Sequence, residues 1–556
     1  MQNVPGRVGE LPDPQSEVVG ILTDLQQQEV KTRAWTRENL VLAGLTGLAF
    51  GLAFPPFRFG FLAYWALVPF FTLLEGKNTK ETIRWSYVTG LFVHLTTLYW
   101  IGWVTLPGAI GAILFLPLFF VLYGLGHNLL ANRLGPQFIY VIPFWWTAIE
   151  YLRSLGQVGF PWISLGYTQT YYTALIQYAS ATSVFGVSFW VVWINVLIYD
   201  LLHSLDNVRK CVRLLVAIVA LFALPLLHGW IVLHQPGQVR EKVRLALIQG
   251  NIDPYEKWDE AFLDENFTTY ERLTNLALRQ RPDLVVWPET ALPTYIRYDA
   301  HYLRWMREHV RNWDVPVLTG VPDYDVYSDG STRTYNAAFL FDPNQNEIQR
   351  YDKIQLVPFG ERVPYQGMLG WFKRLLDRLE MGEGDFSPGK AVRVFSFRKR
   401  FEADSLVRDV RFGTVICFES VFPDLVRKFV ARGAEFLIVI TNDGWFGRTS
   451  GPYQHAQAAV FRAIENRCWL ARCANTGISA FIDPYGRVVK RSGLDEEAIL
   501  VGDVELRKGE TFFSKHGNVF SWAVSLANLL PFGMAFSGRA FRSATQKREA
   551  SEWEAA

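Results

Sequence analysis

The stretch Arg411-Phe-Gly-Thr-Val-Ile-Cys-Phe-Glu-Ser420 decides how the second half of this chain is interpreted. Its apolar, β-branched run is typical of a strand buried in a sheet, and Cys417 stands where that strand ends. Two other apolar runs also end in charged residues: Leu284-Val-Val-Trp-Pro-Glu289 and Tyr351-Asp-Lys353. Because open α/β sheets place their sites at strand ends, the three side chains are candidates for one functional site.

A thiol, a carboxylate and an ammonium form a complete set for covalent acyl transfer. Glu289 can act as general base, Cys417 as nucleophile, and Lys353 as the cation that stabilises an oxyanion. Each residue alone also has a structural interpretation. A lone buried Cys is usually a small apolar residue, a Glu flanked by Pro and Thr can begin a helix, and a Lys in a hairpin is usually solvated. Their joint placement at strand ends favours the catalytic interpretation.

The region around these residues, 241–507, predicts an α/β domain. Short apolar runs alternate there with helical stretches, which is typical of a sheet with both faces covered. The turn signals Asp342-Pro-Asn344 and Asp483-Pro-Tyr-Gly486 indicate two hairpins. The runs expected to form buried strands are 243–249, 284–287, 315–320, 412–416 and 436–441.

The first 235 residues and a stretch near the C-terminus have a different composition. Half of the 556 residues are hydrophobic, only 19% are charged, and there are 41 Phe, 23 Tyr and 20 Trp. Because a membrane span needs about 20 apolar residues, we expect about eight spans and a polytopic α-helical membrane domain. The net charge of +2 gives no basis for a nucleic-acid partner. The expected spans are 38–55, 60–75, 85–105, 109–131, 138–152, 180–202, 212–233 and 516–537.

Lys and Arg are unevenly divided between the two sets of loops that these spans define. Cytoplasmic loops carry an excess of both, so the richer set is expected inside. The opposite loops offer only Arg58 and Arg153. Both termini are therefore predicted to be cytoplasmic, and seven spans place the 241–507 domain outside the cytoplasm. The richer set is Arg7, Lys31, Arg33, Arg37, Lys77, Lys80, Arg84, Arg133, Arg209, Lys210, Arg213, Arg539, Arg542, Lys547 and Arg548.

These observations divide the chain into five parts. We expect a cytoplasmic tail over 1–37, a seven-span membrane domain over 38–234 and the α/β domain over 241–507. An eighth span over 508–540 and a basic cytoplasmic tail over 541–556 follow. The four Cys residues show neither metal-ligand spacing nor a disulfide framework, so they indicate no metal site. No cofactor is expected either.

An amphipathic stretch over 365–379 has two interpretations. Trp371 and Phe372 belong to its apolar face, with Lys and Arg between the apolar positions. A helix of this kind can pack into a core, or it can lie in the outer leaflet beside the site and control access as a lid.

Several motifs resemble those of one superfamily. Trp287-Pro-Glu289, Asp352-Lys-Ile-Gln-Leu-Val-Pro-Phe-Gly-Glu361 and Cys417-Phe-Glu419 resemble the Glu–Lys–Cys motifs of the nitrilases, and Thr441-Asn-Asp-Gly-Trp-Phe-Gly447 resembles a loop of the same superfamily. The similarity is greatest to its membrane branch, the apolipoprotein N-acyltransferases. In the membrane half, Trp145-Trp-Thr-Ala-Ile-Glu-Tyr-Leu-Arg153 and Gly159-Phe-Pro-Trp162 resemble that family too.

The resemblance implies a nitrilase-like α-β-β-α sandwich with Glu289 as base, Lys353 as oxyanion stabiliser and Cys417 as nucleophile. It implies a supporting carboxylate at Glu361. Phe418 departs from the pattern, because some members have Tyr there, which removes a hydroxyl donor. The further residues that the resemblance implies are Glu419 and Asn336 as supports of the site and Trp258 and Trp445 as residues that shape substrate access.

The reaction that the resemblance implies has two steps in the bacterial inner membrane. Cys417 takes an acyl chain from a phospholipid, and the thioester then passes it to the α-amino group of a lipoprotein's N-terminal diacylglyceryl-cysteine. A monomer is expected. Two alternatives are a membrane-anchored nitrilase-type amidase, which would need only one anchor, and a non-catalytic transporter or receptor, which predicts a degraded triad and repeated spans.

Overall fold

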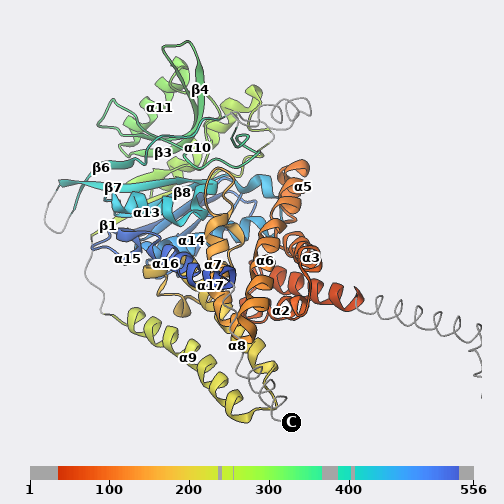
Figure 1. The fold of residues 1–556 in the computed structure, drawn as a ribbon. Helices are drawn as coiled ribbons and strands as arrows, with labels where there is room; N and C mark the ends of the chain where they lie inside the picture. Colours follow the sequence, from red (N-terminus) through yellow and green to blue (C-terminus); the bar gives the residue numbers. More distant parts are fainter. Residues whose placement is uncertain (1–35, 236–240, 255, 366–385, 402–406, 538–556) are drawn as a thin grey trace, which may run out of the picture.

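The computed structural model describes residues 36–235, 241–254, 256–365, 386–401 and 407–537 (Figure 1). It consists of a bundle of helices and an α/β domain that lies at one end of the bundle. The expected tail at 541–556, most of the expected tail at 1–37, and Trp371 and Phe372 with the 365–379 helix beyond its first residue lie outside the described residues.

Two six-stranded sheets form the α/β domain within the described residues. The first has the strand order β12-β1-β2-β3-β4-β5 and the second β11-β10-β9-β8-β7-β6. In each sheet three neighbouring strands run parallel, β1-β2-β3 and β7-β8-β9, and the other pairs are antiparallel. The strands are β1 Lys242–Gln249, β2 Leu284–Val286, β3 Val317–Val326, β4 Thr332–Phe341, β5 Gln349–Asp352, β6 Val394–Arg400, β7 Val407–Ile416, β8 Phe436–Thr441, β9 Leu470–Ala474, β10 Ala480–Ile482, β11 Val488–Arg491 and β12 Ala498–Glu505.

Alternation along β1 shows how the layers are stacked. Leu245 and Leu247 belong to the apolar core that the two sheets share, whereas Ala246 and Ile248 pack with helices α10 (Leu263–Leu278) and α11 (Ala300–Trp313). Helices α13 (Pro423–Ala431) and α14 (Gly451–Asn466) cover the second sheet. Because both faces of each sheet are covered, the strands have continuous apolar runs. The expected α-β-β-α sandwich is confirmed.

The helical bundle is built mainly from the first half of the chain. A helix over 36–53 leads into it, and the chain returns to it after the α/β domain. The further helices are η1 Gly60–Tyr64, α2 Val68–Leu74, α3 Thr79–Leu98, α4 Ile101–Val104, α5 Leu106–Phe115, α6 Pro117–Leu134, η2 Gly135–Val141, α7 Ile142–Arg153, α8 Ala179–Leu202, α9 Val208–Leu233, α15 Phe512–His516, α16 Val519–Ala527 and α17 Leu529–Phe536.

Four helical stretches among the described residues are long and apolar enough to cross a membrane: Leu106–Arg153, Ala179–Leu202, Val208–Leu233 and Val519–Phe536. Four of the expected spans fall within them, and the last, 516–537, overlaps Val519–Phe536. The expected spans 38–55, 60–75 and 85–105 do not.

The helix that corresponds to the expected span 85–105, α3, begins and ends earlier than that span, and local capping explains its start. Asn78 and Glu81 form a capping box that begins α3 at Thr79, so charged residues lie in its first turns. The helix ends at Leu98, and the chain bends there into α4 and α5.

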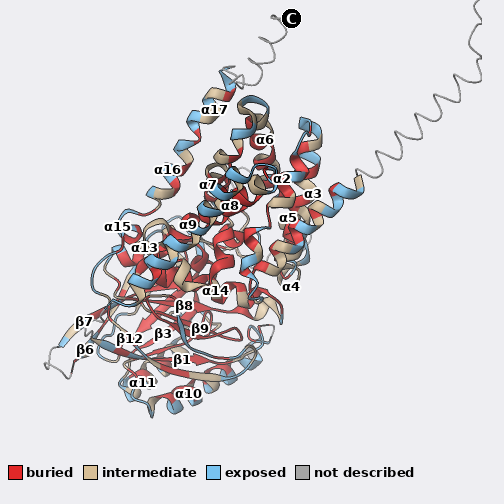
Figure 2. Ribbon diagram, turned by 90° about the horizontal axis from the view of Figure 1, so that it is seen from below, coloured by how far each residue is buried: buried red, intermediate tan, exposed pale blue. Residues whose placement is uncertain are grey.

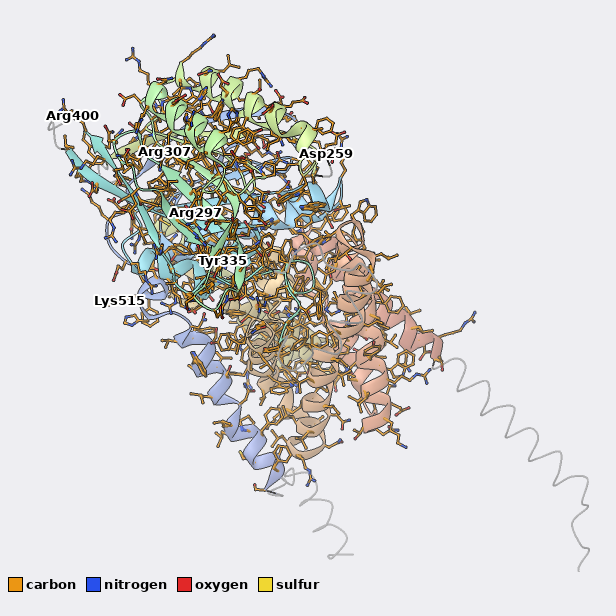
Figure 3. The ribbon with its side chains drawn as sticks, turned by 90° about the horizontal axis from the view of Figure 1, so that it is seen from above. Asp259, Arg297, Arg307, Tyr335, Arg400 and Lys515 are labelled. Atoms are coloured by element: carbon orange, nitrogen blue, oxygen red, sulfur yellow. The ribbon has the colours of Figure 1, made fainter. Side chains whose placement is uncertain are left out.

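The surface of the bundle differs from that of the α/β domain. In α9 (Val208–Leu233), only 6% of the most apolar 18-residue stretch is buried inside the structure. The outer faces of α16 and α17 are exposed (Figure 2). Large exposed apolar faces of this kind are typical of lipid contact. In contrast, Arg297, Arg307 and Arg400 lie on the α/β domain, away from the bundle (Figure 3).

Candidate active site

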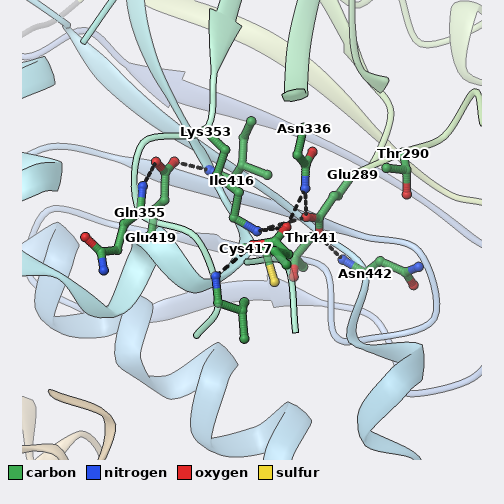
Figure 4. A network of polar contacts seen from close by, with 12 residues as sticks. Glu289, Thr290, Asn336, Lys353, Gln355, Ile416, Cys417, Glu419, Thr441 and Asn442 are labelled. Atoms are coloured by element: carbon green, nitrogen blue, oxygen red, sulfur yellow. Dashed lines mark hydrogen bonds and ion pairs between the residues drawn. The ribbon is translucent and has the colours of Figure 1, made fainter. Parts of the chain in front are cut away.

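Three strand ends bring the expected catalytic side chains together. Glu289 follows β2 and Lys353 follows β5 in the first sheet, and Cys417 follows β7 in the second. Because the two sheets are stacked face to face, their strand ends meet, and the three side chains lie side by side (Figure 4).

Glu289 is held by three donors. Its Oε1 accepts from Asn336 Nδ2 at 2.8 Å and from Lys353 Nζ at 3.3 Å, and its Oε2 accepts from the backbone N–H of Asn442 at 2.9 Å. The residue is only 6% exposed. Its carboxylate is therefore fixed in one orientation before any substrate binds.

Lys353 lies between two carboxylates. Its Nζ donates to Glu361 Oε1 at 2.8 Å as well as to Glu289, and Asn336 Nδ2 bridges the same two carboxylates through a 2.9 Å bond to Glu361. Burial alone would lower the pKa of Lys353, but the charges of Glu361 and Glu289 outweigh it and raise the pKa. Lys353 is a permanent cation in a buried site.

Cys417 begins the short helix η7 (Cys417–Val421) with a φ of +50°, a region that non-glycine residues rarely adopt. The residue is 9% exposed. Burial raises the pKa of its thiol, the charge of Glu289 raises it further, and Lys353 only partly opposes them. The thiol is therefore protonated at rest, and its attack requires a base that takes the proton.

Glu419 connects the two strand ends that carry Lys353 and Cys417. Its Oε1 accepts from Tyr351 Oη at 2.8 Å and from the backbone N–H of Ile354 at 2.7 Å, and its Oε2 accepts from the N–H of Ile416 at 2.9 Å. Burial raises its pKa to about 6. The structure thus brings together six of the expected site residues: Glu289, Asn336, Lys353, Glu361, Cys417 and Glu419.

Two of the expected access residues, Trp258 and Trp445, lie in segments that contact Glu289 through Lys257 and Asn442. Trp258 is 47% exposed in the loop after β1, and Trp445 lies in η8 (Asp443–Phe446), directly after Asn442. The Gly-Phe-Pro-Trp segment of the bundle also reaches the site, because the ring of Phe418 lies 5.9 Å from that of Phe160.

Lys257 is a site residue that the sequence interpretation missed. Its side chain is fully buried, and its Nζ donates to the carbonyl oxygen of Glu289 and to Thr290 Oγ1, both at 3.1 Å. Burial lowers the pKa of Lys257 to about 7, although the charge of Glu289 opposes the shift. In the sequence, Lys257 stands between Glu256 and Trp258 and resembles a solvated Lys. Its position beside Trp258, an expected access residue, was the only sign in the sequence that it lies near the site.

The arrangement can perform covalent acyl transfer with its own side chains. No group of three or more His, Cys, Asp or Glu residues within the described ranges is placed to hold a metal ion. The four Cys residues are all free thiols.

The stacked sheets with Glu, Lys and Cys at their strand ends define a carbon–nitrogen hydrolase domain. The family model for carbon-nitrogen hydrolases matches residues 244–511, and the model for the apolipoprotein N-acyltransferase N-terminal domain matches residues 46–197.

Curated relatives cover nearly the whole chain. An apolipoprotein N-acyltransferase of Geobacter metallireducens is 36% identical over 515 residues, which are 90% of this chain and 96% of that protein. One of Chlorobaculum tepidum is 35% identical over 494 residues, 85% and 92% of the two chains. The chain belongs to the apolipoprotein N-acyltransferase family. The solved structure of Saccharomyces cerevisiae Nit3, from branch 10 of the nitrilase superfamily, is 18% identical, with a TM-score of 0.36 over 49% of this chain and 93% of that one.

Proposed function

We propose that this chain transfers an acyl chain from a phospholipid, through a thioester on Cys417, to the α-amino group of the N-terminal diacylglyceryl-cysteine of lipoproteins. The observation that carries the proposal is the Glu289–Lys353–Cys417 constellation, which is joined by one continuous apolar core to a membrane bundle. Relatives that share both halves of the chain are named for this activity.

The first half-reaction forms the thioester. The Cys417 sulfur attacks the ester carbonyl of the phospholipid while Glu289 takes the thiol proton, which the raised pKa of Cys417 makes necessary. The Lys353 ammonium stabilises the oxyanion of the tetrahedral intermediate. When the C–O bond breaks, Glu289 returns its proton to the leaving alkoxide, and a lysophospholipid departs.

The second half-reaction forms an amide. The α-amine attacks the thioester carbonyl, and Glu289 takes a proton from the attacking nitrogen. The C–S bond breaks, and that proton restores the Cys417 thiol. Thioesters react readily with amines, so the second step needs no other activation. The buried carboxylate thus acts as base and acid in both halves.

The distribution of basic residues in the bundle supports a site on the outer side of the inner membrane. Tyr99, just after α3, accepts a hydrogen bond from Ser450 N of the α/β domain. The 20-residue helix α3 is about 30 Å long, so its N-terminal part, with Lys80 and Arg84, lies at the far end of the bundle. The α8–α9 turn, which is followed by Arg209 and Lys210 at the start of α9, also lies away from the sheets (Figure 1). Under the positive-inside rule, that far end is cytoplasmic.

We further propose that the chain crosses the membrane eight times and acts as a monomer. The helix over 36–53, the segment Gly60–Leu74 and α3 supply the first three crossings. The long stretch Leu106–Arg153 supplies two, because η2 separates α6 from α7. The remaining crossings are Ala179–Leu202, Val208–Leu233 and Val519–Phe536, and both termini are then cytoplasmic.

Intact-mass spectrometry of the purified protein tests this function. After incubation with phospholipid, the mass should rise by one acyl group, and neutral hydroxylamine should remove it. Cys417→Ala should show neither the adduct nor release of lysophospholipid. A Cys417→Ala protein that still releases lysophospholipid would refute the thioester mechanism, and a small-substrate amidase would leave no phospholipid-derived acyl group on Cys417.

A further inference from the structure

The loop Asn442–Gly451 lies between the candidate base and the helical bundle. At its start, the backbone N–H of Asn442 donates to Glu289 Oε2 at 2.9 Å. Asn475 Nδ2 donates to Asn442 Oδ1 at 3.2 Å and thereby fixes the side chain of the same residue. One donor to Glu289 therefore belongs to the first residue of this loop.

Residues of the bundle hold the other end of this loop. We name Tyr99, Trp100 and Trp103, where α3 ends and the chain bends into α4, the aromatic elbow. Tyr99 Oη accepts a hydrogen bond from Ser450 N at 3.3 Å. The ring of Trp103 lies directly over Gly447, where a Cβ would approach Trp103 Cδ1 to 2.9 Å.

Trp100 supplies the buried part of the same contact. Its ring packs edge-on against Phe446 at 4.7 Å between centroids, and a Cβ on Gly451 would lie 2.9 Å from it. Its Nε1 donates to Gln454 Oε1 at 3.2 Å. The aromatic elbow thus contacts the loop at four places: Phe446, Gly447, Ser450 and Gly451.

These contacts tie the loop to the elbow. Gly447 has a φ of +57°, which a residue with a side chain rarely adopts, and the absent side chain leaves room for Trp103. A displacement of even 1 Å at a catalytic group can reduce a rate about 100-fold. A bundle element that helps to position the Asn442 N–H can therefore change the rate of catalysis.

We propose that the aromatic elbow is a positioning element for Glu289 and acts through the Asn442–Gly451 loop. The inference rests on the proposed function, in which Glu289 is the base. Trp103 is 57% exposed on the bundle, and Leu106 and Ile110 of the next helix, α5, are exposed as well. The geometry of the base thus depends on a helix that faces the lipid, which couples acyl transfer to an intact membrane domain.

Trp103→Leu tests the proposal, with Trp65→Leu as the matched control. Both Trp side chains lie on the bundle and are about equally exposed, at 57% and 53%, but Trp65 is outside the elbow. Trp103→Leu should slow thioester formation at saturating phospholipid at least about 10-fold, with the KM within about twofold and the melting temperature unchanged. Trp103→Phe, which keeps a ring over Gly447, should recover most of the rate, and Trp65→Leu should match the wild type.

A second experiment separates positioning from a general structural role. In a Glu289→Gln background the base is already lost, so adding Trp103→Leu should cause no further loss. If Trp103→Leu lowers the melting temperature, Tyr99→Phe is tested in its place, because this variant removes only the hydroxyl that accepts from Ser450 N. Tyr87→Phe, which removes a tyrosine hydroxyl elsewhere in the bundle, is the control for Tyr99→Phe. Tyr99→Phe should slow thioester formation at least about threefold.

The outcomes distinguish this proposal from the function on which it rests. Wild-type protein that forms no thioester would overturn the proposed function. If the wild type forms the thioester normally and Trp103→Leu forms it as fast as Trp65→Leu does, only the positioning role of the elbow would be overturned. If Trp103→Leu slows thioester formation in the Glu289→Gln background as much as it does in the wild type, the positioning role would be overturned as well, because the elbow would then act through another group.

Discussion

Glu419 accepts a 2.9 Å hydrogen bond from the backbone N–H of Ile416, the residue directly before the candidate nucleophile Cys417. The other oxygen of the same carboxylate receives donors from the loop after Lys353. One buried side chain therefore links the segments that carry the candidate nucleophile and the candidate cation.

Replacement of this carboxylate should cost both stability and activity. In Glu419→Gln the amide NH₂ faces a backbone donor, so we expect a loss of about 1–3 kcal/mol in the free energy of unfolding and a large drop in thioester formation. Denaturant unfolding and acylation rates measure the two effects. Glu497→Gln is the control, because that side chain is 45% exposed in a surface pair with Arg272 and should change stability by less than about 1 kcal/mol. An equal effect of both variants would contradict the role of Glu419.

The candidate base and cation should act as one unit. Glu289→Gln and Lys353→Met should each reduce thioester formation about 100-fold or more, because each removes a group that acts in the transition state. The double variant should lose little beyond either single change. Single-turnover rates with labelled phospholipid measure this, and independent, modest effects would indicate structural roles.

Lys257 makes stability depend on pH. Its pKa in the folded protein is lowered from 10.5 to about 7, so above pH 7 the folded state has lost a proton that the unfolded state keeps. Stability should therefore rise with pH, by about 2 kcal/mol between pH 7 and pH 9, and this contribution should be flat below pH 7.

Unfolding at the two pH values, compared between variants, checks this linkage. Lys257→Met should remove the rise, whereas Lys428→Met should keep it, because Lys428 is 43% exposed in a surface ion pair. An unchanged pH dependence in Lys257→Met would show that another group causes it.

Membrane-impermeant maleimide tests the orientation of the bundle. In a Cys211→Ser background, Ser328→Cys at the exposed β3–β4 hairpin should react in intact spheroplasts, because the α/β domain is proposed to lie outside. Asp206→Cys, in the exposed α8–α9 turn, should react only after permeabilisation. The reverse pattern would place the α/β domain in the cytoplasm.

Local patterns in the sequence were sufficient to predict the layers of the α/β domain. The apolar runs at 243–249, 412–416 and 436–441 became β1, the end of β7 and β8, because a strand covered on both faces needs apolar residues on both. The motifs that end in Glu289, Lys353 and Cys417 could also be recognised, since Lys353 and Cys417 directly follow their strands and Glu289 stands three residues after β2. Span boundaries were less predictable, because hydropathy does not report the capping box at Asn78 that starts α3 early.

The remaining features depended on packing between distant parts of the chain. Lys257 has the sequence context of a solvated residue, and only the tertiary structure buries it against the Glu289 carbonyl. Tyr99 and Ser450 are 351 positions apart, so no periodicity could pair them. Composition and spacing determine which segments form strands and helices, because those preferences are local. The position of the base relative to the bundle depends on how two separately patterned domains fit together, and only the tertiary structure decided that.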